Sequence, residues 1–196
     1  MATKKVTLFS LDPQSYPNTE VEVEIVEDTA ARLDEIAAPQ VEEAIKFATV
    51  QAKPAKAGQV VDTRPRVSYQ GRLYSFAETT QTITPEKESA GAMVVKNPDG
   101  EEYVIATRAK FDGKYESVDG GYRAIDGVKP FRKATKNVAI QTSWGEEQVV
   151  IEGSMFCVAD EKDIYSVSNA SFEGTYTTDP EKIQTILAER AAKLGE

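Results

Sequence analysis

Basic and aromatic residues interleave in one stretch of the chain, between residues 120 and 144. The segment GGYRAIDGVKPFRKATK carries five cationic side chains against a single acid, Asp126, and Trp144 follows shortly after. This composition is typical of sites for phosphate or a single nucleic-acid strand, because cations contact phosphate oxygens and aromatic rings stack on bases. A solvated connection between two structural units explains the same composition, so both interpretations stay open. The candidate ligand-binding residues are Arg123, Lys129, Arg132, Lys133, Lys136 and Trp144.

Residues suited to catalysis are scarce. The chain has no histidine and one cysteine, Cys157, which lies in the apolar segment SMFCV. Hydrolases commonly use an imidazole as base or metal ligand, and a thiol without a neighbouring base stays protonated. The acidic turns NPDGEE and DEKD lack the alternating ligand positions of a calcium loop. We therefore predict no catalytic residues, no metal and no cofactor. A carboxylate-dependent enzyme, with two acids facing each other in one cleft, remains the weaker alternative.

A short motif occurs twice in the chain. FDGKYE at 111–116 returns as FEGTYT at 172–177, and GAMVV at 91–95 returns as GSMFC at 153–157. Tyr103 and Tyr165 match at nearly the same offset. Because three anchors recur in order, we predict a duplicated unit of strand, turn, strand and a tight glycine turn with positive φ at the glycine. The residues of that repeated turn are Phe111, Gly113, Tyr115, Phe172, Gly174 and Tyr176; we interpret them as structural, the alternative being a surface that stacks on a base or a peptide.

The elements that must position these residues begin with two strands, KVTLFSL and VEVEIVE, and the second alternates valine with glutamate. Asp28 or Thr29 caps a helix, and PQVEEAIKFATV at 39–50 is predicted to be a second helical segment with Ala44 and Ile45 facing inward. Short strands separated by glycine, asparagine and aspartate follow up to residue 178. Asp179 and Pro180 then begin an amphipathic helix.

The predicted fold class is α+β, with two tandem small antiparallel β units that form sheets or a barrel. The predicted parts are an acidic N-terminal β-β-α segment at 1–52, a linker at 53–59, β repeat 1 at 60–120, β repeat 2 at 121–178 and the C-terminal helix at 179–196.

The net charge of −9 is concentrated at the N-terminus, because the first fifty residues hold ten acids and four bases. Such a face is either solvated or occupies a basic partner. We expect no general affinity for nucleic acid or for a membrane. The start of the chain lacks the apolar centre of a signal peptide, so we expect a soluble protein in the cytoplasm of the producing or host cell, or one associated with a virion.

The second copy of the repeat, AIQTSWGEEQVVIEGSMFCVADEKDIYSVSNASFEGTY, resembles a small uncharacterised PGDYG-like domain common in phage and prophage genomes. In that domain a T-x-x-G hairpin leads to a G-D strand, then E-x-Y-x-[IV] and a closing F-x-x-x-Y. The likeness covers a third to a half of the chain, and Ala92 and Ser154 replace the aspartate. The resemblance implies phage association and a small β-rich fold, and it supplies no site residues.

The predicted function is that of a non-enzymatic binding or assembly protein, phage-derived, whose tandem β units present loops to a protein partner or to a second copy. The runner-up is a small-ligand or nucleotide-binding protein that uses the stretch from Arg123 to Lys136.

Overall fold

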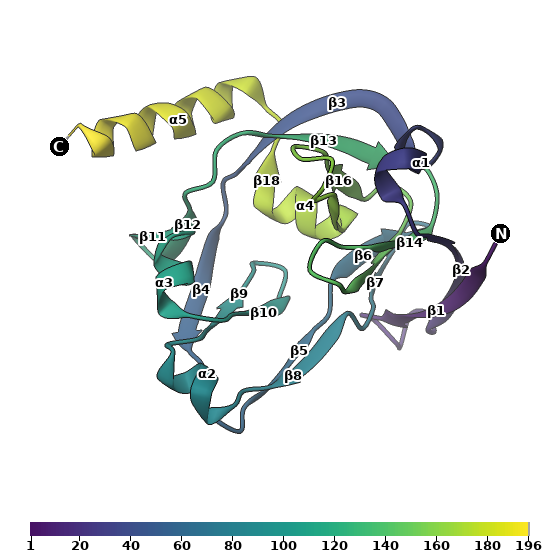
Figure 1. Cartoon of the computed structure of the whole chain (residues 1–196), viewed down its shortest axis with the longest axis horizontal. Helices are drawn as coiled ribbons and strands as arrows, with labels where there is room; N and C mark the ends of the chain where they lie inside the picture. The colour runs from purple at the N-terminus through teal and green to yellow at the C-terminus, as the bar shows by residue number, and fades with distance from the viewer. Residues whose placement is uncertain (196) are drawn as a thin grey trace. The chain divides into compact units, whose positions relative to one another are not determined.

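The computed structural model describes residues 1–195 of the chain, and strands dominate it (Figure 1). The chain divides into two compact units, each assembled from three separate segments. Unit 1 consists of Met1–Glu42, Arg64–Glu78 and Lys129–Phe172, and unit 2 of Glu43–Thr63, Thr79–Val128 and Glu173–Glu196. The protein is mostly β, with minor helices and several antiparallel sheets.

Unit 1 contains a six-stranded sheet with the order β15-β14-β2-β1-β7-β6. Its neighbours pair antiparallel except β14 and β2, which are parallel. The strands are β1 (Thr3–Ser10), β2 (Thr19–Val26), β6 (Arg66–Tyr69), β7 (Arg72–Ser75), β14 (Val138–Gln141) and β15 (Glu147–Val150). In β2, Val21 and Val23 are buried while Glu20 and Glu22 are exposed, which confirms the strand predicted from alternation.

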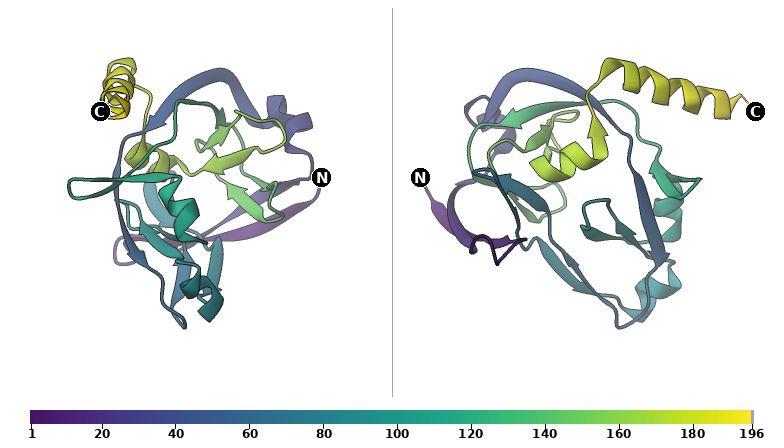
Figure 2. Two further views of the ribbon diagram at one scale, coloured as in Figure 1. Left: turned by 60° about the vertical axis from the view of Figure 1, so that its left-hand side comes forward. Right: turned by 180° about the vertical axis from the view of Figure 1, so that it is seen from behind.

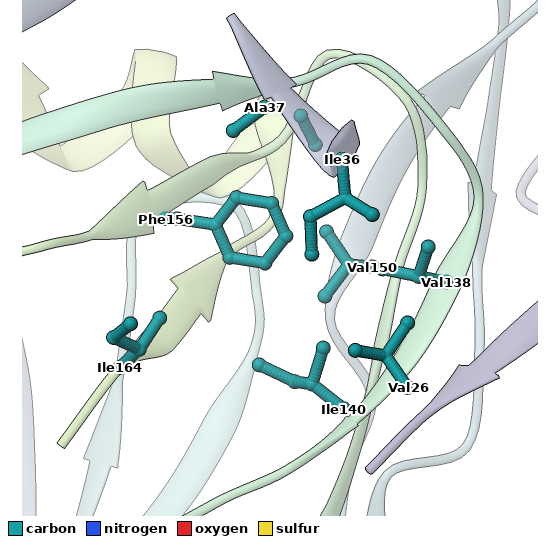
Figure 3. Packing of buried hydrophobic residues seen from close by; sticks show 9 residues of the cluster. Val26, Ile36, Ala37, Val138, Ile140, Val150, Phe156 and Ile164 are labelled. Atoms are coloured by element: carbon teal, nitrogen blue, oxygen red, sulfur yellow. The ribbon is translucent and has the colours of Figure 1, made fainter. Parts of the chain in front are cut away.

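A five-stranded sheet has the order β17-β16-β13-β3-β18, and its strand β3 begins in unit 1 and ends in unit 2. Of the two predicted caps of helix α1, Asp28 or Thr29, the structure has Asp28, whose side chain accepts a hydrogen bond from the Ala31 N–H. Figure 3 shows the ring of Phe156 directed toward Ile36 and Val150 in the apolar core of unit 1. These elements are β3 (Ala37–Lys46), β13 (Lys129–Ala134), β16 (Met155–Cys157), β17 (Tyr165–Val167), β18 (Tyr176–Thr177), α1 (Thr29–Ile36) and α4 (Asn169–Thr175).

Unit 2 contains a five-stranded sheet with the order β10-β9-β4-β12-β11 and a two-stranded ribbon, β5-β8, whose strands lie side by side in Figures 1 and 2. Phe111, Val50 and Met93 are buried together in its core. The elements are β4 (Thr49–Pro54), β5 (Val60–Thr63), β8 (Thr79–Thr82), β9 (Met93–Lys96), β10 (Glu102–Ile105), β11 (Tyr115–Val118), β12 (Gly121–Ala124), α2 (Pro85–Ser89), α3 (Arg108–Asp112) and α5 (Pro180–Leu194).

The predicted helical segment at 39–50 is wrong, because residues 39–46 belong to β3 and residues 49–50 begin β4. Ile45 pairs with Thr177, and Val50 pairs with Tyr122. The helical spacing of apolar residues was therefore overridden by strand pairing with distant segments, which no local pattern records. The predicted linker at 53–59 also begins inside a strand, since Lys53 in β4 pairs with Val94.

The predicted glycine turn of the repeat is wrong as well. Phe111 and Phe172 lie in helices α3 and α4 instead. Gly113 ends α3 with φ of −76°, a right-handed helical value, and Gly174 lies within α4. Thr107 caps α3 by accepting a hydrogen bond from the Lys110 N–H at 3.1 Å. Threonine is a favoured N-cap residue, so the sequence did contain a helix start signal, which the match between the two copies does not reveal.

The order of elements nevertheless recurs: β9, β10, α3 and β11 follow one another in the first copy, and β16, β17, α4 and β18 in the second. A backbone detail recurs with it. The N–H of Phe47, just past β3, donates to the carbonyl of Thr175, just before β18, at 2.9 Å. In the same way the N–H of Ile125, just past β12, donates to the carbonyl of Lys114, just before β11, at 2.9 Å. The likeness of the copies thus extends to β3 and β12, beyond the residues that match in sequence.

The C-terminal helix α5 follows the prediction. Asp179 accepts a hydrogen bond from the Glu181 N–H at 2.9 Å, Pro180 is the first helical residue, and Gly195 follows the last turn. Ile183 and Ile186 are buried against Ile45. The helix is unbroken, as the views in Figure 2 show.

Candidate functional site

The basic and aromatic set predicted as a ligand site is divided between the two units. Arg123 belongs to unit 2, and the other five residues belong to unit 1. The contacts of each residue within its own unit therefore decide which of them can take part in a site.

Arg132 has a structural role in unit 1. Its Nε donates to the Ala38 carbonyl at 2.7 Å, and its Nη2 contacts the Ala37 carbonyl at 3.4 Å and the Asp34 carboxylate at 2.9 Å. These groups lie at the end of α1 and the start of β3, where carbonyls lack helical partners and a cation is favoured. The guanidinium thus stabilises the junction between α1 and β3.

Arg123 has a structural role in unit 2. Its guanidinium forms ion pairs with Glu116 of β11 and Glu189 of α5, each at 3.0 Å. Burial of Glu116 opposes its ionisation, but the hydrogen bond from Arg123 and the charges of Arg123 and Lys193 outweigh burial and lower the pKa of this carboxyl. The side chain of Arg190 donates to the carbonyl of Ala124 in the same region. These contacts hold α5 against β11 and β12.

The aromatic residues of the repeat are core residues and are not exposed to stack on a ligand. Phe111 is 1% exposed, and its ring stacks on Tyr115 with centroids 5.1 Å apart. Phe172 is buried and meets Phe131 edge to face at 5.1 Å. Tyr176 is buried beneath the Lys46 ammonium, which lies 5.7 Å from its ring centroid.

Two tyrosine hydroxyls meet in the core of unit 2. Tyr103 of β10 and Tyr115 of β11 share a hydrogen bond through their hydroxyl groups. Burial raises the pKa of Tyr103 far above its ordinary value, and burial also raises the pKa of Tyr115. Both phenols therefore stay neutral at physiological pH and stabilise the sheet rather than serve as bases.

Trp144 is the aromatic residue of the predicted set that remains on the surface. It lies in the turn between β14 and β15, and 52% of its area is exposed. Its indole Nε1–H donates to the Glu146 carboxylate at 3.0 Å, and the Thr142 hydroxyl donates to the Glu146 carbonyl at 2.8 Å. Gly145 has φ of +84°, which a glycine adopts without strain. The ring is therefore exposed but held by its own turn.

Tyr165 of β17 connects Trp144 with Lys129. The rings of Trp144 and Tyr165 have centroids 6.5 Å apart and an interplanar angle of 52°. The Lys129 ammonium donates to the Tyr165 hydroxyl at 3.4 Å. Ser143 donates to the Asp163 carboxylate at 2.5 Å, which joins the tryptophan turn to the turn before β17. We call Trp144, Tyr165, Lys129, Glu146 and the turn 160–163 the Trp144 surface.

The charge of the Trp144 surface is negative, contrary to what a phosphate site needs. Its acids are Glu146, Asp160, Glu161 and Asp163, and its bases are Lys129 and Lys162. Glu147, the first residue of β15, is paired with Lys4. The two remaining residues of the predicted set are both exposed: Lys133 lies in β13, and Lys136 lies between β13 and β14.

Sequence reasoning did not select Tyr165 for a site, because it was assigned only as a match to Tyr103. A signal in the sequence could have indicated Tyr165. The turn of the predicted hairpin at 138–151 contains Trp144, and Tyr165 is the repeated tyrosine of the same copy. Cys157 is a buried free thiol. Residues 1–195 contain no cluster of three or more potential metal-ligating side chains, and none of their helices is long and apolar enough to cross a membrane.

Comparisons with protein-family models, with curated proteins and with solved structures found no match for the chain. The resemblance of the second copy to the PGDYG-like domain therefore stays a prediction.

Proposed function

We propose that this is a non-enzymatic binding or assembly protein that acts through contacts with another protein chain. The observation that carries the proposal is the half-exposed ring of Trp144, fixed by hydrogen bonds of its own turn. Tryptophan is enriched among the residues that dominate binding energy at protein interfaces. A ring that is already held in place loses little conformational entropy on binding. The Trp144 surface is the candidate contact.

The two alternatives have less support. A nucleotide site needs free cations, yet Arg123 and Arg132 are occupied by structural contacts, and the Trp144 surface carries more acids than bases. A carboxylate-dependent enzyme needs two acids that face each other in one cleft. Glu116 faces the cations Arg123 and Lys193 instead of a second acid.

The fold is consistent with this proposal. We infer that the two copies arose by duplication, since the element order and the Phe47 and Ile125 hydrogen bonds recur. Each copy then presents the loops of its sheet, and the exposed glutamates of β2 offer a second contact for a basic partner. The phage origin rests on the family resemblance alone.

The test compares Trp144→Ala with Leu73→Ala, a control in the same unit with a 42% exposed apolar side chain. Light scattering measures self-association, and cross-linking in an extract of the producing or host cell measures capture of a partner. We expect Trp144→Ala to lose the association that the wild type shows and Leu73→Ala to keep it. Equal association of both variants and the wild type would contradict the proposal, and so would a strictly monomeric wild type that captures nothing.

A further inference from the structure

The Trp144 surface combines an exposed aromatic ring with carboxylates, and this combination defines the ligand chemistry that it suits. The indole N–H is already satisfied by Glu146, so a ligand at the exposed ring meets its aromatic carbons and π system rather than a free donor. Tyr165 stands beside it at an angle of 52°, as a second, tilted aromatic wall. The negative faces of aromatic rings attract cations, and Trp attracts them most strongly.

We propose that the Trp144 surface binds a basic peptide segment, with an arginine side chain stacked on the indole of Trp144. The inference rests on the proposed function and specifies the partner's chemistry. A guanidinium is planar, so it can lie flat on the indole while its N–H groups reach a carboxylate at the edge of the ring. Glu146 is that carboxylate, since it already accepts the indole N–H at 3.0 Å.

Charge complementarity favours a basic occupant over an acidic one. Asp163 is fixed by Ser143 beside Trp144, and the exposed residues Asp160 and Glu161 belong to the same turn. The two lysines of the surface reduce this negative charge without cancelling it. Lys129 contacts the hydroxyl group of Tyr165. A partner that offers arginine and lysine side chains would therefore meet an aromatic platform with an acidic rim.

The experiment uses Trp144 as its own reporter, because it is the one tryptophan of the chain. The full-length protein is titrated with a capped peptide of alternating glycine and arginine, and tryptophan emission is followed. Matched peptides with lysine or glutamate in place of arginine serve as controls. We expect a saturable change with the arginine peptide, a weaker one with the lysine peptide and none with the glutamate peptide. Raising the salt concentration should weaken binding, because the carboxylates are exposed.

Two variants locate the site. Asp163→Asn removes one charge and keeps an oxygen that can accept the hydrogen bond from Ser143. It should lower the affinity for the arginine peptide by about two- to five-fold, the range of an exposed ion pair. Glu152→Gln removes one exposed charge from the same unit, outside both proposed contacts, and should leave binding unchanged. Calorimetry with Trp144→Ala should show no binding. An equal loss in Asp163→Asn and Glu152→Gln would show a general charge effect and overturn the assignment.

The inference fails if the arginine peptide causes no saturable change at millimolar concentration, or if the glutamate peptide or a nucleotide binds equally well. If this occurs while Trp144→Ala still abolishes partner association, the proposed function stands and only the partner chemistry is wrong. If Trp144→Ala also leaves association unchanged, both are wrong.

Discussion

Arg132 and Lys133 are adjacent cations that sequence analysis assigned to one ligand site, and the structure separates their roles. The Arg132 guanidinium bonds the carbonyls of Ala37 and Ala38, whereas the Lys133 side chain is exposed. We therefore predict that Arg132→Ala lowers the free energy of unfolding and that Lys133→Ala leaves it nearly unchanged. The pair is a matched control, since each variant removes one positive charge from neighbouring positions of the same segment.

The magnitude follows from the three contacts of Arg132. A charge-assisted hydrogen bond at 2.7 Å to the Ala38 carbonyl contributes about 1.5–3 kcal/mol. The contact with Ala37 is long, at 3.4 Å, and adds little. Asp34 is 93% exposed, so its ion pair contributes about 0–1 kcal/mol. We expect a loss of about 2–3 kcal/mol for Arg132→Ala and less than about 0.5 kcal/mol for Lys133→Ala.

The assay is urea unfolding followed by far-ultraviolet circular dichroism and by the emission of Trp144, which belongs to the same unit as Arg132. The midpoint should fall for Arg132→Ala in both signals, with the slope unchanged. A loss under about 0.5 kcal/mol would refute the structural role of Arg132. A loss of the same size in Lys133→Ala would show that the effect is one of net charge and not of the bonds to Ala37 and Ala38.

Two further predictions concern pH. The raised pKa of Tyr103 keeps its phenol neutral in the folded protein, whereas in the unfolded chain it ionises above about 10. The free energy of unfolding should therefore fall as pH rises past about 10, and that of Tyr103→Phe should fall less steeply. Urea unfolding at neutral and alkaline pH measures both. If the free energies of the wild type and the variant fell equally with pH, this would contradict the buried pair with Tyr115. The lowered pKa of Glu116 contributes stability above the ordinary glutamate pKa of about 4.3, and this stability is lost as pH falls through the lower folded value. Glu116→Gln should be less stable than the wild type at neutral pH by up to about 1 kcal/mol and should approach it in acid, and a difference that grows in acid would argue against the ion pair with Arg123.

Elements with their own local signals could be predicted from the sequence. Three such signals depend only on neighbouring residues, and the structure has all three elements: the alternation in β2, the Asp28 cap of α1 and the Asp179-Pro180 start of α5. Segment 39–50 could not be predicted in this way. Its apolar spacing suits a helix, and the strand partners that override this spacing lie at Tyr122 and Thr177, far along the chain.

The candidate site was predictable only in part, because side-chain type does not reveal what a side chain contacts. Trp144 and Lys129 were chosen for their chemistry, and the structure joins them through Tyr165. Arg123 and Arg132 were chosen on the same grounds, yet each is bound to partners on other elements. When the acidic or carbonyl partner of a cation lies far away in the sequence, the pairing cannot be recognised until the fold is known.

The repeat gives a physical reason why one copy carries the candidate surface and the other does not. Tyr103 and Tyr165 occupy the same position of the repeat, on β10 and β17. In unit 2 the Tyr103 hydroxyl shares a hydrogen bond with the Tyr115 hydroxyl within the core, so this tyrosine stabilises the sheet. In unit 1 the Tyr165 hydroxyl accepts a hydrogen bond from Lys129, and its ring stands beside the exposed Trp144. Under the proposed duplication, one copy uses this position for packing in its core, and in the other copy the same position lies beside Trp144, at the proposed contact.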